Sequence, residues 1–222
     1  MHRILLYPHI VAGVVALAAM IVPLVAAKGG RVHRRAGWVF VGAMVGVSVT
    51  AFLLAIWRFA QFDAQHPNAR AIGFFLFGVA ALTAAGVSSG IRALRFKTRT
   101  ARHRNAWDLG IAAANVALAL ATLAYGIVGH RTLFVAFSFV GIVSGTGQLR
   151  YWLRAPATRH HWWFAHMSGM LGSCLAALTA LVVVNGAALG APTFATLLWI
   201  AVPGLGIPAI FAWTAYYRRR LK

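Results

Sequence analysis

The chain has 222 residues, of which 61% are hydrophobic and only 10% are charged. Soluble domains are nearer half apolar and about a quarter charged, so most of this chain must face lipid or other helices. The net charge is +19, but the basic residues lie between apolar runs, which argues against a nucleic-acid partner. The single cysteine, Cys174, excludes an intramolecular disulfide and a cysteine-based zinc or iron–sulfur site.

Seven apolar runs are long enough to cross a bilayer, since a spanning helix needs about 20 mostly apolar residues. Only Arg3 precedes the first run and four basic residues follow it, which indicates a retained helix and not a cleaved signal peptide. The sequence therefore predicts an all-α, polytopic membrane protein, a seven-helix bundle with residues 1–222 in a single domain. The predicted spans are Leu5–Ala27, Trp38–Trp57, Ala71–Ile91, Leu109–Val128, Leu133–Leu149, Phe164–Val184 and Phe194–Tyr217.

Lysine and arginine gather at one end of these predicted helices. The stretches 28–35, 92–104, 150–159 and 218–222 hold seventeen of them, and the remaining four are Arg3, Arg58, Arg70 and Arg131. Basic residues favour the cytoplasmic side of a membrane. The chain is therefore expected in a bacterial inner (plasma) membrane, with its N-terminus outside and its C-terminus in the cytoplasm.

Three basic stretches that carry histidine end in tryptophan just before an apolar run: Lys28–Trp38, Arg102–Trp107 and Arg159–Trp163. They indicate loops at the cytoplasmic interface, and three helix hairpins followed by a seventh helix. Pro203 and Pro208 predict a kink or break in that helix. Small residues four apart, such as Gly42/Gly46, Gly86/Gly90, Gly141/Gly145 and Gly169/Ser173, predict closely packed helices.

A polar stripe crosses the fourth predicted helix. Asp108, Asn115 and Thr122 follow one another at intervals of seven residues and so share one face. Polar groups inside a bilayer are costly and are candidates for function. We predict an inner-facing site at His33, Asp108, Asn115 and His166 that handles protons or a small molecule. In the simpler alternative, Asp108 pairs with Arg104 or another inner arginine, and the other two bond to neighbouring helices.

The histidines lie at two depths, which allows a second interpretation. A transmembrane di-haem electron carrier needs two imidazoles for each iron at matching depth. His9 and His130 lie near the outer face, and His33, His103 and His166 near the inner one. The alternative function is thus a b-type haem or quinone-linked redox protein, with His9, His130 and His166 as candidate haem ligands. No metal site is predicted, because two acidic residues are too few for a two-metal carboxylate site.

A third interpretation is a structural or interaction subunit. Its basic cytoplasmic face would bind anionic lipids or an acidic partner. The sequence leaves open whether the chain is an enzyme and whether it forms a homo-oligomer.

Two N-terminal segments carry a family resemblance: PHIVAGVVAL at Pro8–Leu17 and KGGRVHRRAGWVFVGAM at Lys28–Met44. They resemble a family of predicted bacterial membrane proteins, domain of unknown function 2306, and HHWWFAHMSGML further on is a looser match. The resemblance implies a multi-helix membrane protein and no established activity. The residues that carry it are His9, Gly13, Lys28, Gly29, His33, Arg34, Gly37 and Met44.

Overall fold

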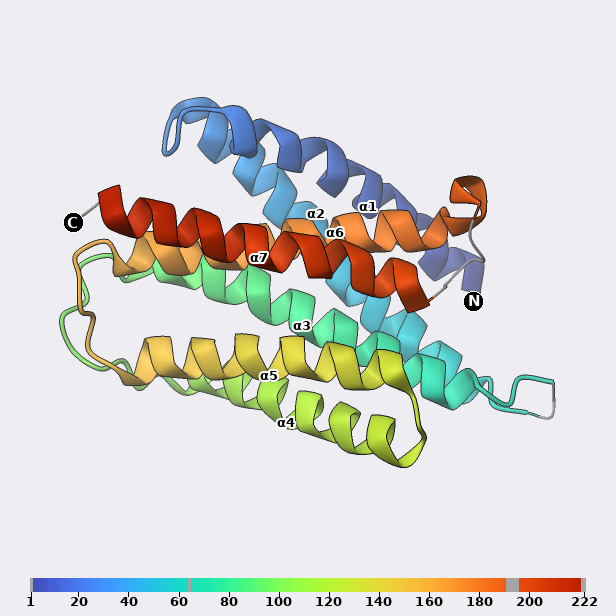
Figure 1. Cartoon of the computed structure of the whole chain (residues 1–222). Coiled ribbons are helices and arrows are strands. Elements are labelled where there is room, and N and C mark those ends of the chain that lie inside the picture. The colour runs from blue at the N-terminus through green and yellow to red at the C-terminus, as the bar shows by residue number, and fades with distance from the viewer. Residues whose placement is uncertain (1, 64, 191–195, 221–222) are drawn as a thin grey trace. The chain divides into compact units, whose positions relative to one another are not determined.

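A computed structural model describes residues 2–63, 65–190 and 196–220, where all the regular structure is helical (Figure 1). Seven of these helices are long and apolar enough to cross a membrane, which confirms seven predicted spans and supports a multi-pass membrane protein. Phe194, where the seventh predicted span begins, lies outside the described residues. The helices are α1 (His2–Val25), α2 (Arg31–Ala60), α3 (Ala69–Arg95), α4 (Ala106–Val128), α5 (Thr132–Leu153), α6 (His161–Val184), the short 3-10 helix η1 (Gly186–Leu189) and α7 (Thr196–Arg220).

Large apolar side chains cover the outside of these helices. Val25, Val128 and Leu205 each keep about four-fifths of their surface exposed, at 80%, 83% and 79%. Such exposure is unfavourable in water but is expected of side chains that face lipid.

The chain forms two compact units, Met1–Ala84 and Ala85–Lys222. Helix α3 runs through the boundary, so its first part belongs to unit 1 and its last part to unit 2. The prediction of a single domain over residues 1–222 stays a prediction.

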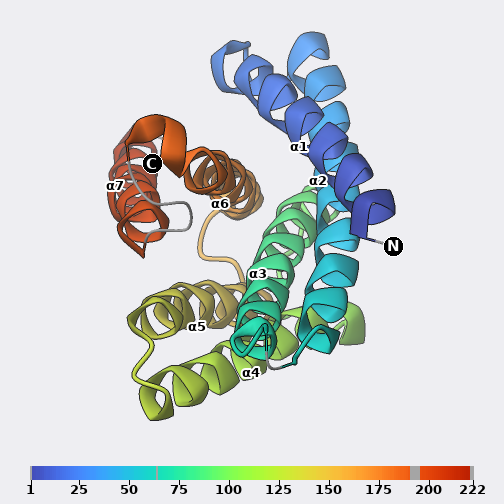
Figure 2. The same cartoon turned by 90° about the vertical axis from the view of Figure 1, so that its right-hand side faces the viewer.

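In unit 1, α1 and α2 pack along each other as a hairpin (Figures 1 and 2). The turn between them is shorter than predicted, because α2 begins at Arg31 and takes in most of the expected Lys28–Trp38 loop. Gly29 makes this tight turn with a φ of 77°, a conformation that favours glycine. The arginines that follow are good helix formers whose long side chains reach water from within a helix.

In unit 2, α4 packs with α5, and α6 packs with α7 (Figure 2). Helix α7 continues through Pro203 and Pro208, so of the predicted kink or break the break is absent, and the kink stays a prediction. A proline removes one backbone donor, and the remaining hydrogen bonds hold this helix together.

Two of the predicted small-residue contacts are close in unit 2. A Cβ added to Gly169 on α6 would lie 2.6 Å from the carbonyl oxygen of Gly86 and 2.9 Å from Cα of Gly90, both on α3. A Cβ added to Gly141 on α5 would lie 2.7 Å from the Cβ of Ala119 on α4. In unit 1, by contrast, a Cβ at Gly42 would have no atom within 4 Å.

Candidate functional site

The candidate site lies where α4 begins. The side chain of Asn105 caps this helix and accepts hydrogen bonds from the backbone N–H groups of Trp107 and Asp108, at 3.0 and 3.3 Å. Asparagine is a preferred N-cap, because its oxygen satisfies donors that the first turn leaves unpaired. Asp108 follows in that turn, where the helix dipole favours a negative charge.

The Asp108 carboxylate binds two basic side chains. Arg92 on α3 donates from Nε to Oδ1 at 2.7 Å and from Nη2 to Oδ2 at 2.6 Å. His103, in the segment between α3 and α4, places Nε2 at 2.8 Å from Oδ2. The side chain of Asp108 is only 2% exposed, against 19% for Arg92 and 15% for His103. Two parallel bonds of this kind fix an arginine and a carboxylate in one geometry.

These bonds determine which nitrogen of His103 can exchange a proton. The guanidinium of arginine stays charged, so Asp108 facing it is held as a carboxylate that can only accept hydrogen bonds. His103 must therefore keep the proton on Nε2 to donate to Oδ2. In the neutral imidazole, Nδ1 is then the ring nitrogen without a proton.

Aromatic rings surround this Arg92–Asp108–His103 triad. The ring centroid of His103 is 4.2 Å from that of Phe96 and 4.7 Å from that of Trp152. The backbone N–H of His103 donates to the carbonyl oxygen of Trp152 at 2.9 Å, and the guanidinium of Arg92 lies 5.2 Å from the Phe96 ring centroid. The imidazole is thus packed between α3 and α5 and is not a free side chain of a basic loop.

Arg99 fastens the same segment to the end of α5. Its guanidinium donates to the carbonyl oxygens of Tyr151, Trp152 and Arg154, at 2.7, 3.3 and 2.9 Å. The last carbonyls of a helix have no partner within it, so a long basic side chain that reaches them stabilises the helix end. Arg99 also lies 4.7 Å above the ring of Tyr151.

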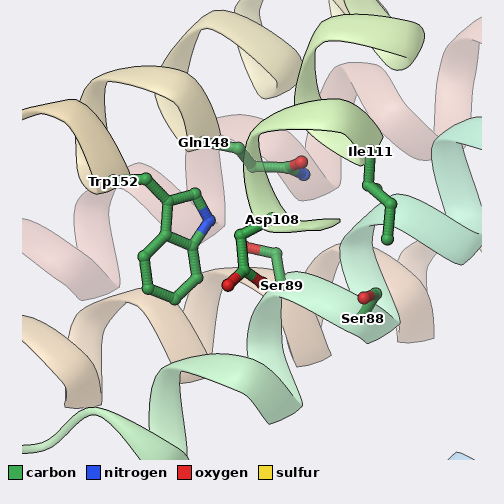
Figure 3. Close-up of a pocket in the computed structure, with 6 residues that line it drawn as sticks. All are labelled: Ser88, Ser89, Asp108, Ile111, Gln148 and Trp152. Carbon is green, nitrogen blue, oxygen red and sulfur yellow. The ribbon is translucent and has the colours of Figure 1, made fainter. Parts of the chain in front are cut away.

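A shallow depression adjoins Asp108. Its lining comes from three helices of unit 2: Ser88 and Ser89 on α3, Ile111 on α4, and Gln148 and Trp152 on α5 (Figure 3). The spaces among these side chains are too narrow for a water-sized molecule. In this conformation the depression offers polar groups but no volume for a ligand.

The other polar residues of α4 are buried as predicted, but they pack against neighbours. Asn115 donates from Nδ2 to the carbonyl oxygen of Gly141 on α5, at 3.4 Å, and Thr122 donates to the carbonyl of Leu118 in its own helix, at 2.8 Å. Seven residues of helix separate members of the stripe by roughly 10 Å, about three times a hydrogen-bond length. Direct hydrogen bonds therefore do not link the members of the stripe: Asn115 bonds a neighbouring helix, as the simpler alternative predicted, and Thr122 bonds its own helix. A role of this face in proton or substrate handling stays a prediction.

Three of the four residues of the predicted inner site belong to unit 2, and the fourth belongs to unit 1. Asp108 and Asn115 lie on one face of α4, and His166 on α6 places Nδ1 at 3.0 Å from the carbonyl oxygen of Gly90. His33 belongs to unit 1, where its Nδ1 is 3.2 Å from the carbonyl oxygen of Pro23.

The predicted haem ligands near the outer face, His9 and His130, belong to different units, so their pairing stays a prediction. Two other pairs lie within one unit. His130 precedes α5 and His166 follows it, so the 22 residues of this helix lie between them, a length of about 33 Å. In unit 1, His9 bonds to Thr50 at 2.9 Å, while His33 lies 17 residues earlier on α2, roughly 25 Å away. Neither pair can share one iron. Among the described residues, no group of three or more His, Cys, Asp or Glu could hold a metal ion.

The N-terminal segments that carry the family resemblance build the α1–α2 hairpin. Lys28 donates from Nζ to the carbonyl oxygens of Pro23 and Leu24, at 2.8 and 2.6 Å. His33 contacts the Pro23 carbonyl as well, and Met44 is buried at 1% exposure. These residues cap the carbonyl end of α1 and fill the core beside it, so their local role is structural.

The second acidic residue forms a pair on the surface. Asp63, in the segment between α2 and α3, accepts a hydrogen bond from Nδ1 of His66 at 2.9 Å, and the two side chains are 56% and 45% exposed. The hydrogen bond from His66 lowers the pKa of Asp63 below its ordinary value.

Comparisons with known proteins return nothing: no family model, no curated protein and no solved structure matches this chain.

Sequence reasoning identified Asp108 and expected an inner arginine as its partner, but it did not single out Arg92 or link His103 to the pair. Arg92 lies 16 residues before Asp108, too far for a local spacing rule to link them. His103 was noted only as an interfacial histidine. The signal in the sequence is that His103 lies five residues before Asp108 and just before Asn105, a residue type that caps helices. A capped helix start lets the residues before it lie beside the first turn, where Asp108 is.

Proposed function

We propose that this chain is a multi-pass membrane protein that handles protons at the Arg92–Asp108–His103 triad. One observation carries the proposal: a carboxylate at the end of a membrane span is almost completely buried and is shared by a guanidinium and an imidazole. Ionisable groups at such positions are functional candidates. Histidine is also the side chain type that changes charge near neutral pH.

A proton suits this site better than a larger ligand does. The depression beside Asp108 has no room for a molecule in this conformation, whereas a proton needs only an acceptor atom. Asp108, itself bound by Arg92, holds the imidazole by Nε2, so Nδ1 of His103 is the atom that is left to accept a proton. A positive charge on the imidazole is stabilised by the Asp108 carboxylate. It also weakens the hydrogen bond from Arg92 to the same carboxylate oxygen, Oδ2.

The tautomer of His103 tests this proposal. In lipid nanodiscs, nitrogen NMR of labelled histidine should show that the neutral imidazole of His103 carries its proton on Nε2. Asp108→Asn should remove this preference for one tautomer, and His103→Gln assigns the signal. His66 is the matched control, because it approaches Asp63 through Nδ1 and should show the opposite tautomer. If the neutral ring instead carries its proton on Nδ1, Asp108 does not hold the imidazole as proposed and the proposal fails.

Orientation and location belong to the same proposal. The charge split supports an outer N-terminus and a cytoplasmic C-terminus in a bacterial inner membrane, with the triad near the cytoplasmic face. Reporter fusions after Arg104 should therefore report cytoplasm, and fusions within residues 66–70 the opposite side. The reverse result would overturn the orientation and leave the triad chemistry unaffected.

Two further parts of the proposal rest on the sequence. Membership of the family of domain of unknown function 2306 is supported by the residues from His9 to Met44 that carry the resemblance. Contact of the basic face with anionic lipids is supported by the excess of lysine and arginine at that end of the helices.

A further inference from the structure

The basic end of unit 2 has almost no carboxylates of its own. The whole sequence contains two acidic residues, and the one near this end, Asp108, is already bound by Arg92 and His103. The other basic side chains of this end therefore have no acidic side chain of the chain to pair with. Their charge must be balanced by anions from outside.

Two of these cations are held in place by aromatic rings. Nζ of Lys97, in the segment after α3, lies 4.6 Å from the ring centroid of Trp162. The guanidinium of Arg218, near the end of α7, lies 5.5 Å from the ring centroid of Phe164. Both rings belong to the first turn of α6, and both cations are exposed. A ring face attracts a cation without neutralising it, so each cation keeps its charge at a defined place.

The rings also set the depth of these cations. Trp163 packs against Tyr217 with ring centroids 5.0 Å apart, and Tyr217 stacks on Trp213 at 6.4 Å. Tryptophan and tyrosine collect at the level of lipid headgroups, where one side of the ring is apolar and the other is wet. Cations fixed among such rings, at the ends of spans α6 and α7, lie at the depth of the lipid phosphates.

We infer that Lys97, backed by Trp162, and Arg218, backed by Phe164, each bind the headgroup phosphate of an anionic phospholipid. These two contacts deepen the proposed lipid contact, and they rest on the membrane placement of the chain but not on proton handling. Trp162 and Phe164 lie two residues apart and so face different sides of α6, and each phosphate meets one cation there while the acyl chains lie along the apolar surface of the helices. A soluble acidic protein fits less well, because the rings that hold the cations lie at the level of the lipid.

Lipid selectivity tests the site. In nanodiscs that contain phosphatidylglycerol and phosphatidylcholine, native mass spectra of the released protein should show retained phosphatidylglycerol. Lys97→Gln with Arg218→Gln should lower this preference by on the order of tenfold, since each basic residue near the surface attracts anionic lipid. Arg102→Gln with Arg104→Gln is the matched control. It removes the same charge from exposed side chains of the same basic segment, and it should leave most of the preference.

A second measurement does not depend on variants. Phosphatidylglycerol brominated near its headgroup should quench the tryptophan fluorescence of the wild-type protein more than brominated phosphatidylcholine does. Equal quenching by the two lipids would overturn the inference, and so would equal losses in the two double variants, which would indicate a diffuse charge effect. Competition by inorganic phosphate, but not by sulfate at the same ionic strength, would assign the site to free phosphate instead. None of these outcomes changes the expected tautomer of His103, so the two proposals fail separately.

Discussion

The two acidic residues of this chain have the same kind of partner in very different settings. Asp63 in unit 1 pairs with His66 three residues later, and both side chains are about half exposed. Asp108 in unit 2 pairs with His103 and also with Arg92, and its side chain is 2% exposed. In water a carboxylate needs no buried counter-charge, and Asp63 accepts local hydrogen bonds only, from the backbone N–H groups of Gln65 and His66 and from the His66 ring. A buried carboxylate must have its charge matched and its oxygens hydrogen-bonded.

The comparison shows that an ion pair affects stability mainly where it is buried. Exposed pairs contribute little to stability, because solvent screens them and ordering two side chains costs entropy. For a buried pair, the loss of one partner leaves the other charge uncompensated. The same substitution should therefore act very differently in the two units.

The largest expected effect comes from neutralising the buried acid. Asp108→Asn should destabilise unit 2 by about 3–5 kcal/mol, because Arg92 is left partly buried without its counter-charge. Asp63→Asn, the matched substitution in unit 1, should cause no measurable change. Melting temperatures of the detergent-solubilised variants check this comparison. Small and equal shifts would mean that solvent reaches Asp108, and the contrast between the units would break down.

A smaller effect should follow from packing, and it sharpens the same contrast. Gly169→Ala in unit 2 forces a methyl group against the backbone of α3, and overpacking of this kind costs about 1–3 kcal/mol. Gly42→Ala in unit 1 adds the same methyl group where no atom lies within 4 Å. Alanine is also the better helix former by up to about 1 kcal/mol, so this control should be neutral or slightly stabilising.

Unfolding in detergent, followed by circular dichroism, measures both glycine variants. If Gly169→Ala is tolerated as well as Gly42→Ala, then α3 and α6 do not pack as closely as the contact between Gly86 and Gly169 indicates.

The sequence by itself determined the helices of this protein and the membrane that they require. Seven long apolar runs must hydrogen-bond internally where no water is present, and a helix satisfies this need residue by residue. The predicted spans therefore agree with α1 to α7 to within a few residues at most ends. The prediction from local composition was wrong at a helix boundary: Arg31–Trp38 has the composition of a loop but forms the start of α2.

Only the tertiary structure decided which polar groups work together. Arg92 reaches Asp108 because the end of α3 lies beside the start of α4, and Arg99 finds the carbonyls of α5 more than 50 residues away. These partners are set by the packing of helices, which depends on side-chain shape and not on spacing along the chain. The sequence therefore indicated a costly buried acid, whereas the fold supplied the guanidinium and the imidazole that make its burial tolerable.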